Sequence, residues 1–542
     1  MSKINAPHYP IIYVRGYAGT DNEVEDTVSD PYMGFNLGST KLRTVWTGAT
    51  ERYYFESPLV RLMKDFGYRD VYSSGLDSAA IDTMAPGTMP ANSIVIYRYY
   101  DLVSSSFGSG KQVRMEDFGT GLGALIEKLR DRICGNDAPS RNDFKVYLVG
   151  HSMGGLVIRC FLQNDKISTP ATKGLVDKVF TYATPHNGID LDIIGNVPGF
   201  FTHNSADNFN RKRMAQYLGL HGGDDPDMDQ SDVAFKEVNT LNGKFDQNRF
   251  FCLIGTNPKD YLVASGWSAR VVGPFSDGLV RMDNAFVDNP SGDPARPKVL
   301  APRAYVYRSH SGYFGIVNSE EGFQNLTRFL FGNIRVDGTL DIRDISLPAA
   351  LETERMNGKN VRASYQFECI ARVRGVHWDL SRRVATENST IFRTYAELFP
   401  RAQKANDAGK SLDRPNHDTP QIFTAFLSSD ERFLTQPPSL GFTIDLGVLV
   451  PDYEVDGIAW LKDHFPGGYI FRDKLNLEAT PPQAQGATWT LRYGFDSDTS
   501  NKATTPVPSK QVGGKLEFRI SIKKAARPGI DADLILTATN WN

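Results

Sequence analysis

A chain of 542 residues is longer than one hydrophobic core usually organises, so two or three domains are expected. Lysine and arginine total 60 and aspartate and glutamate total 63, and this near balance argues against a general attraction to nucleic acid or to an anionic membrane. Apolar residues make up 40% and charged residues 23%, as in soluble globular proteins, and no apolar run is long enough to span a bilayer.

The N-terminal segment bears on where the protein resides. Residues Met1 to Pro10 are polar and lead directly into an apolar segment at Ile11. A secretory signal combines a basic start, an apolar stretch and a cleavage site, and this segment lacks that combination. We therefore expect a cytoplasmic protein by default and leave open export by a route that needs no cleaved signal.

Strand and helix patterns alternate from residue 1 to residue 335. Apolar runs of strand length are Tyr9–Val14, Ser93–Tyr100, Val146–Gly150, Val176–Ala183, Arg249–Gly255 and Arg303–Tyr307. Between them, Ser57–Phe66 and Met115–Ile133 carry apolar residues at helical spacing. A further helix follows the last strand, where Asn318 and Glu321 are spaced as a capping box. This alternation predicts an α/β domain with a doubly wound, mainly parallel sheet.

The pattern changes at about Val336, where apolar and polar residues begin to alternate. Segments with this alternation are Val361–Val373, Phe442–Val450, Trp489–Phe495 and Leu516–Ile522. They predict a separate all-β, sandwich-like accessory domain over residues 336–542. The segment Asp496–Gln511 is polar, and we expect a mobile loop there.

One stretch carries most of the chemical information. Residues Val146 to Arg159 read V-Y-L-V-G-H-S-M-G-G-L-V-I-R, which places G-x-S-x-G between a strand and a helix. This arrangement is typical of a nucleophile elbow, whose strained turn lifts the hydroxyl of Ser152 above the sheet edge while Gly150 and Gly154 let strand and helix approach. The N–H of Met153, at the helix N-terminus, is then directed at a developing oxyanion. A chance glycine turn is the alternative, and the strand and helix patterns on either side disfavour it.

A serine nucleophile needs a base and an acid that orients the base. In hydrolases with this elbow, the acid and then the base follow the serine along the chain. His310 directly follows the last strand of the α/β part, so it should lie at the same sheet edge as Ser152. Asp277, in the segment S-D-G-L-V, is the predicted acid; Asp283 is its nearest competitor, and an ordinary Asp-Gly turn is the structural alternative. His151 is expected to pack or to line the pocket.

Four motifs carry a family resemblance: Ile11–Gly19, the G-H-S-M-G-G elbow, Thr184–Gly188, and Asp277–Val280 with His310. Together they resemble the lipase and esterase branch of the α/β-hydrolase superfamily, bacterial lipases in particular. The resemblance implies that the backbone N–H of Tyr17 is a second oxyanion donor beside that of Met153. The chain departs from the family at Arg15-Gly16, where such lipases usually carry His-Gly. Because the donor is a backbone group, this departure need not abolish the oxyanion hole.

The resemblance and the predicted Ser-His-Asp triad imply acyl transfer through an acyl-enzyme, with no metal or organic cofactor. We predict a serine ester hydrolase of lipase or carboxylesterase type, acting on an acyl ester or lipid in transient contact with a membrane or lipid surface. One alternative is a phospholipase acting on membrane lipids, for example an exported antibacterial effector. An alternative of another class is a non-catalytic binding or scaffold protein. No nucleic acid is expected as a partner, and the partner of the β domain is left open.

Residues 186–248 form an insertion that opens with the amphipathic segment Ile189–Ile194. A mobile lid or cap over the pocket and a helix packed permanently on the core are equally open for it. Within the insertion, Asp225, Asp227 and Asp229 alternate like the start of a calcium loop. Gln230 stands where that loop needs glycine, so a solvated acidic loop is expected instead.

Aromatic residues also cluster in the long segment between Asp21 and Tyr54. They could line an acyl pocket, although ordinary packing is expected for most of them: Tyr32, Phe35, Trp46, Tyr53 and Tyr54.

Overall fold

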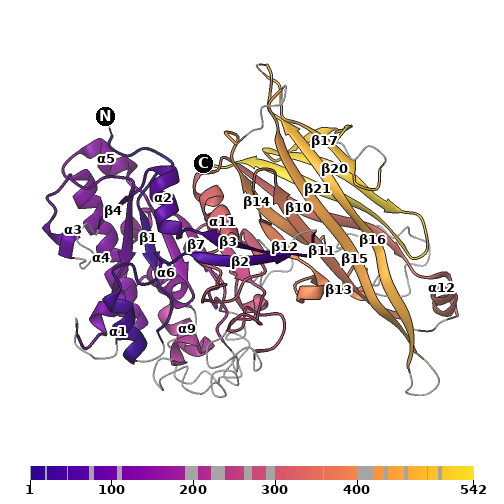
Figure 1. The fold of residues 1–542 in the computed structure, drawn as a ribbon, viewed down its shortest axis with the longest axis horizontal. Coiled ribbons are helices and arrows are strands. Elements are labelled where there is room, and N and C mark those ends of the chain that lie inside the picture. Colours follow the sequence, from indigo (N-terminus) through magenta and orange to yellow (C-terminus); the bar gives the residue numbers. More distant parts are fainter. Residues whose placement is uncertain are drawn as a thin grey trace. The chain divides into compact units, whose positions relative to one another are not determined.

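A computed structural model describes residues 2–18, 21–44, 47–71, 79–106, 113–189, 206–220, 238–261, 272–288, 300–357, 359, 361–376, 378–398, 419–431, 437–456, 462–484, 486–498 and 503–542. The chain divides into two compact units, Met1–Phe331 and Gly332–Asn542. Unit 1 is drawn in indigo to magenta and rose in Figure 1, and unit 2 in orange to yellow.

Unit 1 is built on a seven-stranded sheet in which every neighbouring pair of strands is parallel. The strands, in spatial order, are β4 (Arg69–Asp70), β5 (Ser93–Tyr97), β1 (Ile11–Val14), β6 (Val146–His151), β7 (Val176–Tyr182), β8 (Phe250–Gly255) and β9 (Arg303–Val306). Strands β1, β5, β6 and β8 are buried almost throughout, as expected where helices cover both faces of a parallel sheet. The predicted mainly parallel, doubly wound sheet is confirmed.

Helices of unit 1 pack on this sheet and on one another (Figure 1). Helix α6 packs on β1, β6 and α4, whereas α11 packs on β7 and β8. The helices are α1 (Asp21–Ser29), α2 (Pro58–Phe66), α3 (Ala79–Thr83), α4 (Met115–Cys134), α5 (Ala138–Asp143), α6 (Met153–Gln163), α7 (Pro170–Lys173), α9 (Arg211–Tyr217) and α11 (Glu320–Phe331), with a short hairpin of β2 (Ser39–Thr44) and β3 (Thr50–Phe55).

The start of α11 differs from the predicted capping box. Ser319 accepts the N–H of Gly322 on its side-chain oxygen at 2.9 Å, so Ser319 rather than Asn318 caps the helix. Glu321 does not reach back to the cap, because its carboxylate is paired with Arg308 and Lys41. The prediction of a capping box is wrong, because two cations stabilise the buried carboxylate of Glu321 more than one backbone N–H would.

Unit 2 consists of two antiparallel sheets that share one hydrophobic core. One sheet has the order β14 (Gln421–Leu427), β10 (Ile334–Ser346), β21 (Gly529–Asn540), β20 (Lys515–Lys524) and β19 (Ser509–Val512). The other contains β12 (Ser381–Arg383), β11 (Val361–Val373), β15 (Leu440–Asp456), β16 (Lys462–Thr480), β17 (Thr490–Phe495) and β18 (Thr505–Val507), with β13 (Ile391–Thr394) also paired to β11. The described part of this unit also contains the short helices α12 (Ala349–Met356) and α13 (Tyr395–Leu398). The predicted all-β character of this region is confirmed.

Two parts of unit 2 depart from the sequence prediction. Strand β16 was not expected, because Pro466, Gly467 and Gly468 interrupt its pattern; the backbone of Gly467 lies so close to β15 that a Cβ would meet the carbonyl oxygen of Val450 at 1.9 Å. The polar segment Asp496–Gln511 is not a loop throughout, because it contains β18 and most of β19. Pairing with β17 buries Val507, and tertiary pairing of this kind is not visible in a polar sequence.

No helix in the described part of the chain combines the length and the apolar character that crossing a bilayer requires.

Candidate active site

The turn between β6 and α6 holds Ser152 in a backbone conformation that side chains rarely adopt. Its φ is 52° and its ψ is −125°. The N–H of Ser152 donates to the carbonyl of Tyr182 at 2.9 Å, and its own carbonyl accepts the hydroxyl of Thr184 at 2.9 Å. These bonds to the adjoining β7 edge stabilise the strained turn. The second bond also gives Thr184, the first residue of the Thr184–Gly188 motif, a structural role.

Glycines make the turn sterically possible. A Cβ on Gly150 would lie 2.7 Å from the backbone N of Gly155, so β6 and α6 approach only because that side chain is absent. A Cβ on Gly154 would lie 2.1 Å from the carbonyl oxygen of Val14, so the first turn of α6 packs directly on the end of β1. The local geometry is that of a nucleophile elbow.

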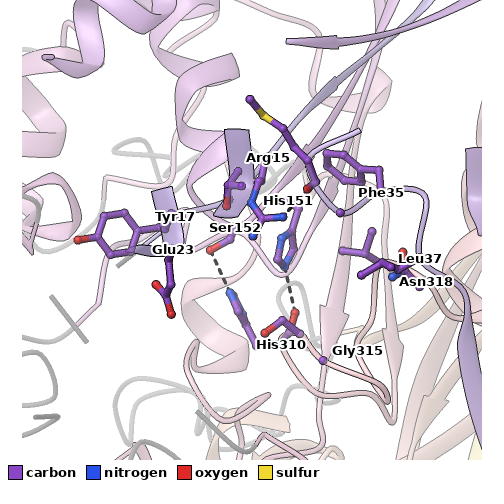
Figure 2. A pocket seen from close by; sticks show the side chains of 18 of the residues that line it. Arg15, Tyr17, Glu23, Phe35, Leu37, His151, Ser152, His310, Gly315 and Asn318 are labelled. Carbon is purple, nitrogen blue, oxygen red and sulfur yellow. Dashed lines mark hydrogen bonds between the residues drawn. The ribbon is translucent and has the colours of Figure 1, made fainter. Parts of the chain in front are cut away.

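The structure brings Ser152, His310 and Asp277 together. Figure 2 shows the first of the two contacts, between Ser152 and His310. The Oγ of Ser152 lies 3.0 Å from Nε2 of His310, and the Nδ1 of His310 lies 2.9 Å from Oδ2 of Asp277. All three side chains are buried, with 4%, 4% and 1% of their residue surface exposed. A chain of hydrogen bonds therefore runs from the hydroxyl to the carboxylate through one imidazole.

The other oxygen of Asp277 is also occupied. Its Oδ1 accepts the backbone N–H groups of Leu279 and Val280 at 3.0 and 2.8 Å, and the Asp277 carbonyl accepts the N–H of His310. Gly278 has a φ of 98°, and a Cβ there would lie 2.4 Å from the Cβ of Tyr261. These contacts leave the carboxylate no freedom to turn away from the imidazole.

Asp283, the competing acid, lies on the 3-10 turn Met282–Asn284, where it is exposed. The imidazole of His310 is hydrogen-bonded to Asp277 and not to Asp283. The structure thus brings Asp277, and not Asp283, to the histidine.

Both predicted oxyanion donors adjoin the serine. Met153 is the first residue of α6, and Gly16, which precedes Tyr17, packs so closely that a Cβ on it would lie 2.7 Å from the Cβ of Ser152. The backbone from Arg15 to Ala18 is held from outside: the Tyr99 hydroxyl donates to the Arg15 carbonyl at 2.7 Å, and the N–H of Ala18 donates to the Tyr100 hydroxyl at 2.7 Å.

Tyr99 and Tyr100 follow β5 and were not predicted as site residues. Burial raises the pKa of both hydroxyls, so both stay neutral and can act as fixed hydrogen-bonding groups. Their signal in the sequence is only a Tyr-Tyr pair at the end of a strand, which is equally typical of ordinary packing.

The side chain of His151 contacts the backbone of His310. Its Nε2 lies 3.0 Å from the carbonyl oxygen of His310, and since a carbonyl only accepts, this nitrogen carries the proton. Burial and the nearby His310 hold the pKa of His151 well below its usual value, so the ring is neutral. The neutral ring lines the cavity and fixes the backbone of His310.

A cavity of about 620 Å³ opens above Ser152. Figure 2 shows Tyr17 and Glu23 on one side of the serine, and Phe35 and Leu37 on the other. Of the aromatic residues in the first long segment, Phe35 lines the cavity, whereas Tyr32 bonds to Asp70 and Tyr54 is exposed. Trp46 lies outside the described residues.

Most of the 186–248 insertion, including positions 190–205 and the acidic segment at 221–237, lies outside the described residues. Its described parts are anchored by Arg159, a residue of α6 that sequence reasoning missed. This fully buried guanidinium donates to the carbonyls of His186, Val238 and Thr240 at 2.6 to 2.8 Å. Arg159 thereby joins segments on both sides of the insertion to the helix that follows Ser152.

Residues 123–220 match the family description "PGAP1-like alpha/beta domain", and this range contains the elbow. Together with the parallel order of the sheet and the turn at Ser152, this match decides the fold. Unit 1 has the α/β-hydrolase fold. The resemblance found in the sequence is therefore confirmed at the level of the fold. No protein with a curated description matches the chain.

Solved structures give weaker similarities. The chain is similar to the lipase BlEst2 of Bacillus licheniformis in its mature form, with 15% identity, a TM-score of 0.28, and coverage of 60% of this chain and 94% of that chain. It is also similar to the phospholipase PlaB from Legionella pneumophila, with 13% identity, a TM-score of 0.29, and coverage of 84% and 90%. Similarities with TM-scores this low carry no argument about the activity of this chain.

Among the described residues, no group of three or more His, Cys, Asp or Glu is arranged to hold a metal ion.

Proposed function

We propose that this protein is a serine ester hydrolase that cleaves acyl esters through an acyl-enzyme on Ser152. The observation that carries the proposal is the series of hydrogen bonds from Ser152 through His310 to Asp277, beside a cavity that Ser152 and His310 line. Residues of this kind in this geometry are the requirement for nucleophilic acyl transfer. The three side chains come from separate segments: the end of β6, the loop after β8 and the loop after β9. Their meeting in this geometry argues against a chance arrangement.

The proton path follows from the two hydrogen bonds. The hydroxyl of Ser152 donates to Nε2 of His310 and loses its proton to that atom as Oγ attacks the ester carbonyl. Asp277 stabilises the resulting imidazolium by accepting the Nδ1–H. The imidazolium then gives its proton to the departing alcohol, and a water activated by the same nitrogen releases the acid.

The negative charge on the tetrahedral intermediate would be held by the N–H groups of Met153 and Tyr17. Each donor of this kind is worth about 3 kcal/mol of the activation barrier. Because both groups belong to the backbone, the arginine at position 15 does not remove either of them.

The cavity also suits a substrate with an acyl chain. Phe35 and Leu37 form one of its walls, and Leu37 and Tyr313 are 59% and 82% exposed where they line it. Exposed apolar side chains around a cavity mouth fit transient contact with a lipid surface. The proposed substrate is therefore an acyl ester or lipid, with no metal or organic cofactor in the reaction.

Substitution of the triad tests the proposal. Ser152→Ala and His310→Ala are each expected to lower kcat for p-nitrophenyl acyl esters by about 10⁴-fold or more, because the triad acts as a unit. Thermal unfolding of each variant should stay close to that of the parent protein. A fluorophosphonate that fails to label Ser152 in the folded protein would favour the non-catalytic alternative and contradict the proposal.

The acid is tested separately with a matched pair of variants. Asp277→Asn keeps the shape of the side chain but favours the wrong tautomer of His310, so kcat should fall by about 10⁴-fold. Asp283→Asn, at an exposed site, is the control and should leave kcat unchanged. Full activity in Asp277→Asn would show that another group orients the base.

A further inference from the structure

The side chain of Arg15 has no role in the proposed reaction, although it lies beside the nucleophile. Arg15 follows β1, lines the cavity and is half-buried. Figure 2 shows its guanidinium close to His151 and Ser152. The positive charge of Arg15 contributes to lowering the pKa of His151, which agrees with this placement. A permanent positive charge thus stands next to the position of the scissile ester.

The described residues pair this guanidinium with a carbonyl group and with no carboxylate. One terminal nitrogen, Nη1, donates to the carbonyl of Met33. Within the described parts of the chain Arg15 forms no ion pair, and its buried Nε has no hydrogen-bond partner. A half-buried guanidinium without an anion is costly, and an anionic group of a ligand would remove that cost.

Acidic side chains elsewhere in the cavity limit the kind of anionic ligand that it can bind. Glu23 and Asp26, on α1, line the cavity, and Figure 2 shows Glu23 on the side opposite Phe35 and Leu37. Asp30 also lines it, but its carboxylate already accepts the N–H groups of Tyr32 and Gly34. Among the described residues that line the cavity, acidic side chains outnumber basic ones, which favours a ligand with one anion and one cation over a ligand with a net negative charge.

We propose that Arg15 binds the phosphodiester of a zwitterionic glycerophospholipid whose acyl ester lies at Ser152. This inference rests on the proposed ester hydrolysis and names its substrate class. The glycerol backbone joins a phosphodiester to an acyl ester through a few bonds, so one molecule can occupy both positions. Its acyl chain then lies along Phe35 and Leu37. Its ammonium group faces Glu23 and Asp26, which form the acidic wall of the cavity. A neutral acyl ester would leave the guanidinium without a partner.

Monomeric short-chain substrates test this without an effect of the lipid surface. The full-length protein is given dihexanoyl-phosphatidylcholine and dihexanoylglycerol, which differ only in the headgroup, and kcat/KM is measured for both. The phosphatidylcholine should be the better substrate. Arg15→Gln should lower kcat/KM for the phosphatidylcholine by about 10- to 100-fold more than for the diacylglycerol, because a charge-assisted hydrogen bond is lost. Arg15→Lys should recover part of the difference, since it keeps the charge but not the planar fork.

Arg69→Gln is the matched control, because Arg69 is exposed on β4 and does not line the cavity. It should leave the ratio of the two kcat/KM values unchanged. If Arg15→Gln does not fold, competition decides: sn-glycero-3-phosphocholine should inhibit diacylglycerol hydrolysis by the parent protein, and glycerol should not. Stronger inhibition by inorganic phosphate than by glycerophosphocholine would identify a free-phosphate site and overturn the proposal.

Two results would overturn the role of Arg15 while leaving ester hydrolysis intact. One is an equal loss on both substrates in Arg15→Gln, as expected of a purely structural residue. The other is a parent protein that prefers the diacylglycerol. Failure of the underlying reaction looks different, because the parent protein would then hydrolyse neither substrate and Ser152 would not react with a fluorophosphonate.

The acidic wall gives a second readout. Dihexanoyl-phosphatidylcholine should be preferred over dihexanoyl-phosphatidylglycerol, whose net charge is negative. Glu23→Gln and Asp26→Asn should each reduce this preference by about two- to fivefold, as expected for single, partly exposed charges. A parent preference for the phosphatidylglycerol would contradict the charge argument.

Discussion

At the scale of single residues, buried cations hold unit 1 together at places where the backbone leaves carbonyl groups without partners. Lys178, on β7, is completely buried and its ammonium donates to the carbonyls of Phe329 and Leu330 at 3.1 and 2.8 Å. These carbonyls belong to the last turn of α11, where the helix dipole favours a positive charge. Burial nevertheless lowers the pKa of Lys178 to about 7.

This pKa predicts a pH dependence of stability. Between about pH 7 and the usual lysine pKa near 10, the unfolded chain binds a proton at Lys178 that the folded chain does not, so the free energy of unfolding should rise with pH over this interval. Denaturant unfolding of the parent protein and of Lys178→Met at several pH values measures the effect. As pH rises, the free energy of unfolding of the parent protein should increase relative to that of Lys178→Met. A difference that is constant with pH would contradict the lowered pKa.

At the scale of elements, the site depends on contacts between a few segments that surround the end of β6. Helix α6 directly follows Ser152, and its Arg159 joins it to carbonyls on both sides of the 186–248 insertion. The 3-10 turn Tyr99–Leu102 holds the segment that contains Tyr17. Arg308, also buried, is paired with Glu321 of α11, which anchors the loop that leads to His310. The positions of the candidate site residues are therefore set by neighbouring elements as well as by the elbow.

Arg159 gives a testable consequence at this scale. Arg159→Met should lower the free energy of unfolding by at least about 3 kcal/mol, because several buried carbonyl oxygens lose their donor at once. Arg69→Met, at an exposed site, should change it by less than about 0.5 kcal/mol. Urea denaturation compares the two variants with the parent protein. Equal, small effects would mean that water or another donor replaces the guanidinium.

At the scale of the whole molecule, the chain forms two units of different architecture. Unit 2 has its own core, to which residues of both antiparallel sheets contribute, for example Leu340, Leu446 and Ile520. A unit with its own core can unfold as a cooperative body. The candidate site residues Ser152, Asp277 and His310 all lie in unit 1.

Calorimetry of the full chain tests this division. Leu446→Ala should destabilise unit 2 by about 2 to 5 kcal/mol through the cavity that it creates in a fully packed core. Two thermal transitions are expected, and only one of them should move to lower temperature. A single transition that moves as a whole would show that the two units unfold together.

The fold of unit 1 and the identity of the candidate site residues were predictable because their signals are local or depend on chain order. The elbow needs a strand, three small or strained positions and a helix within one short stretch, and Gly150, Ser152 and Gly154 supply them in sequence. Asp277 and His310 could be chosen because the ends of successive parallel strands meet at one sheet edge. The extent of a strand was less predictable where pairing with a neighbouring strand determines it, as in β16 and β18.

By itself the sequence determined the class of fold, the all-β character of the second region and the candidates for nucleophile, base and acid. Only the tertiary structure decided what surrounds them: Ser319 rather than Asn318 as the cap of α11, Arg159 as the anchor of the insertion, and a charge on Arg15 that no described carboxylate pairs with. The physical reason is the range of the interactions. A turn or an amphipathic strand is encoded by adjacent residues, whereas the partner of a buried polar group is chosen from segments far away in the chain.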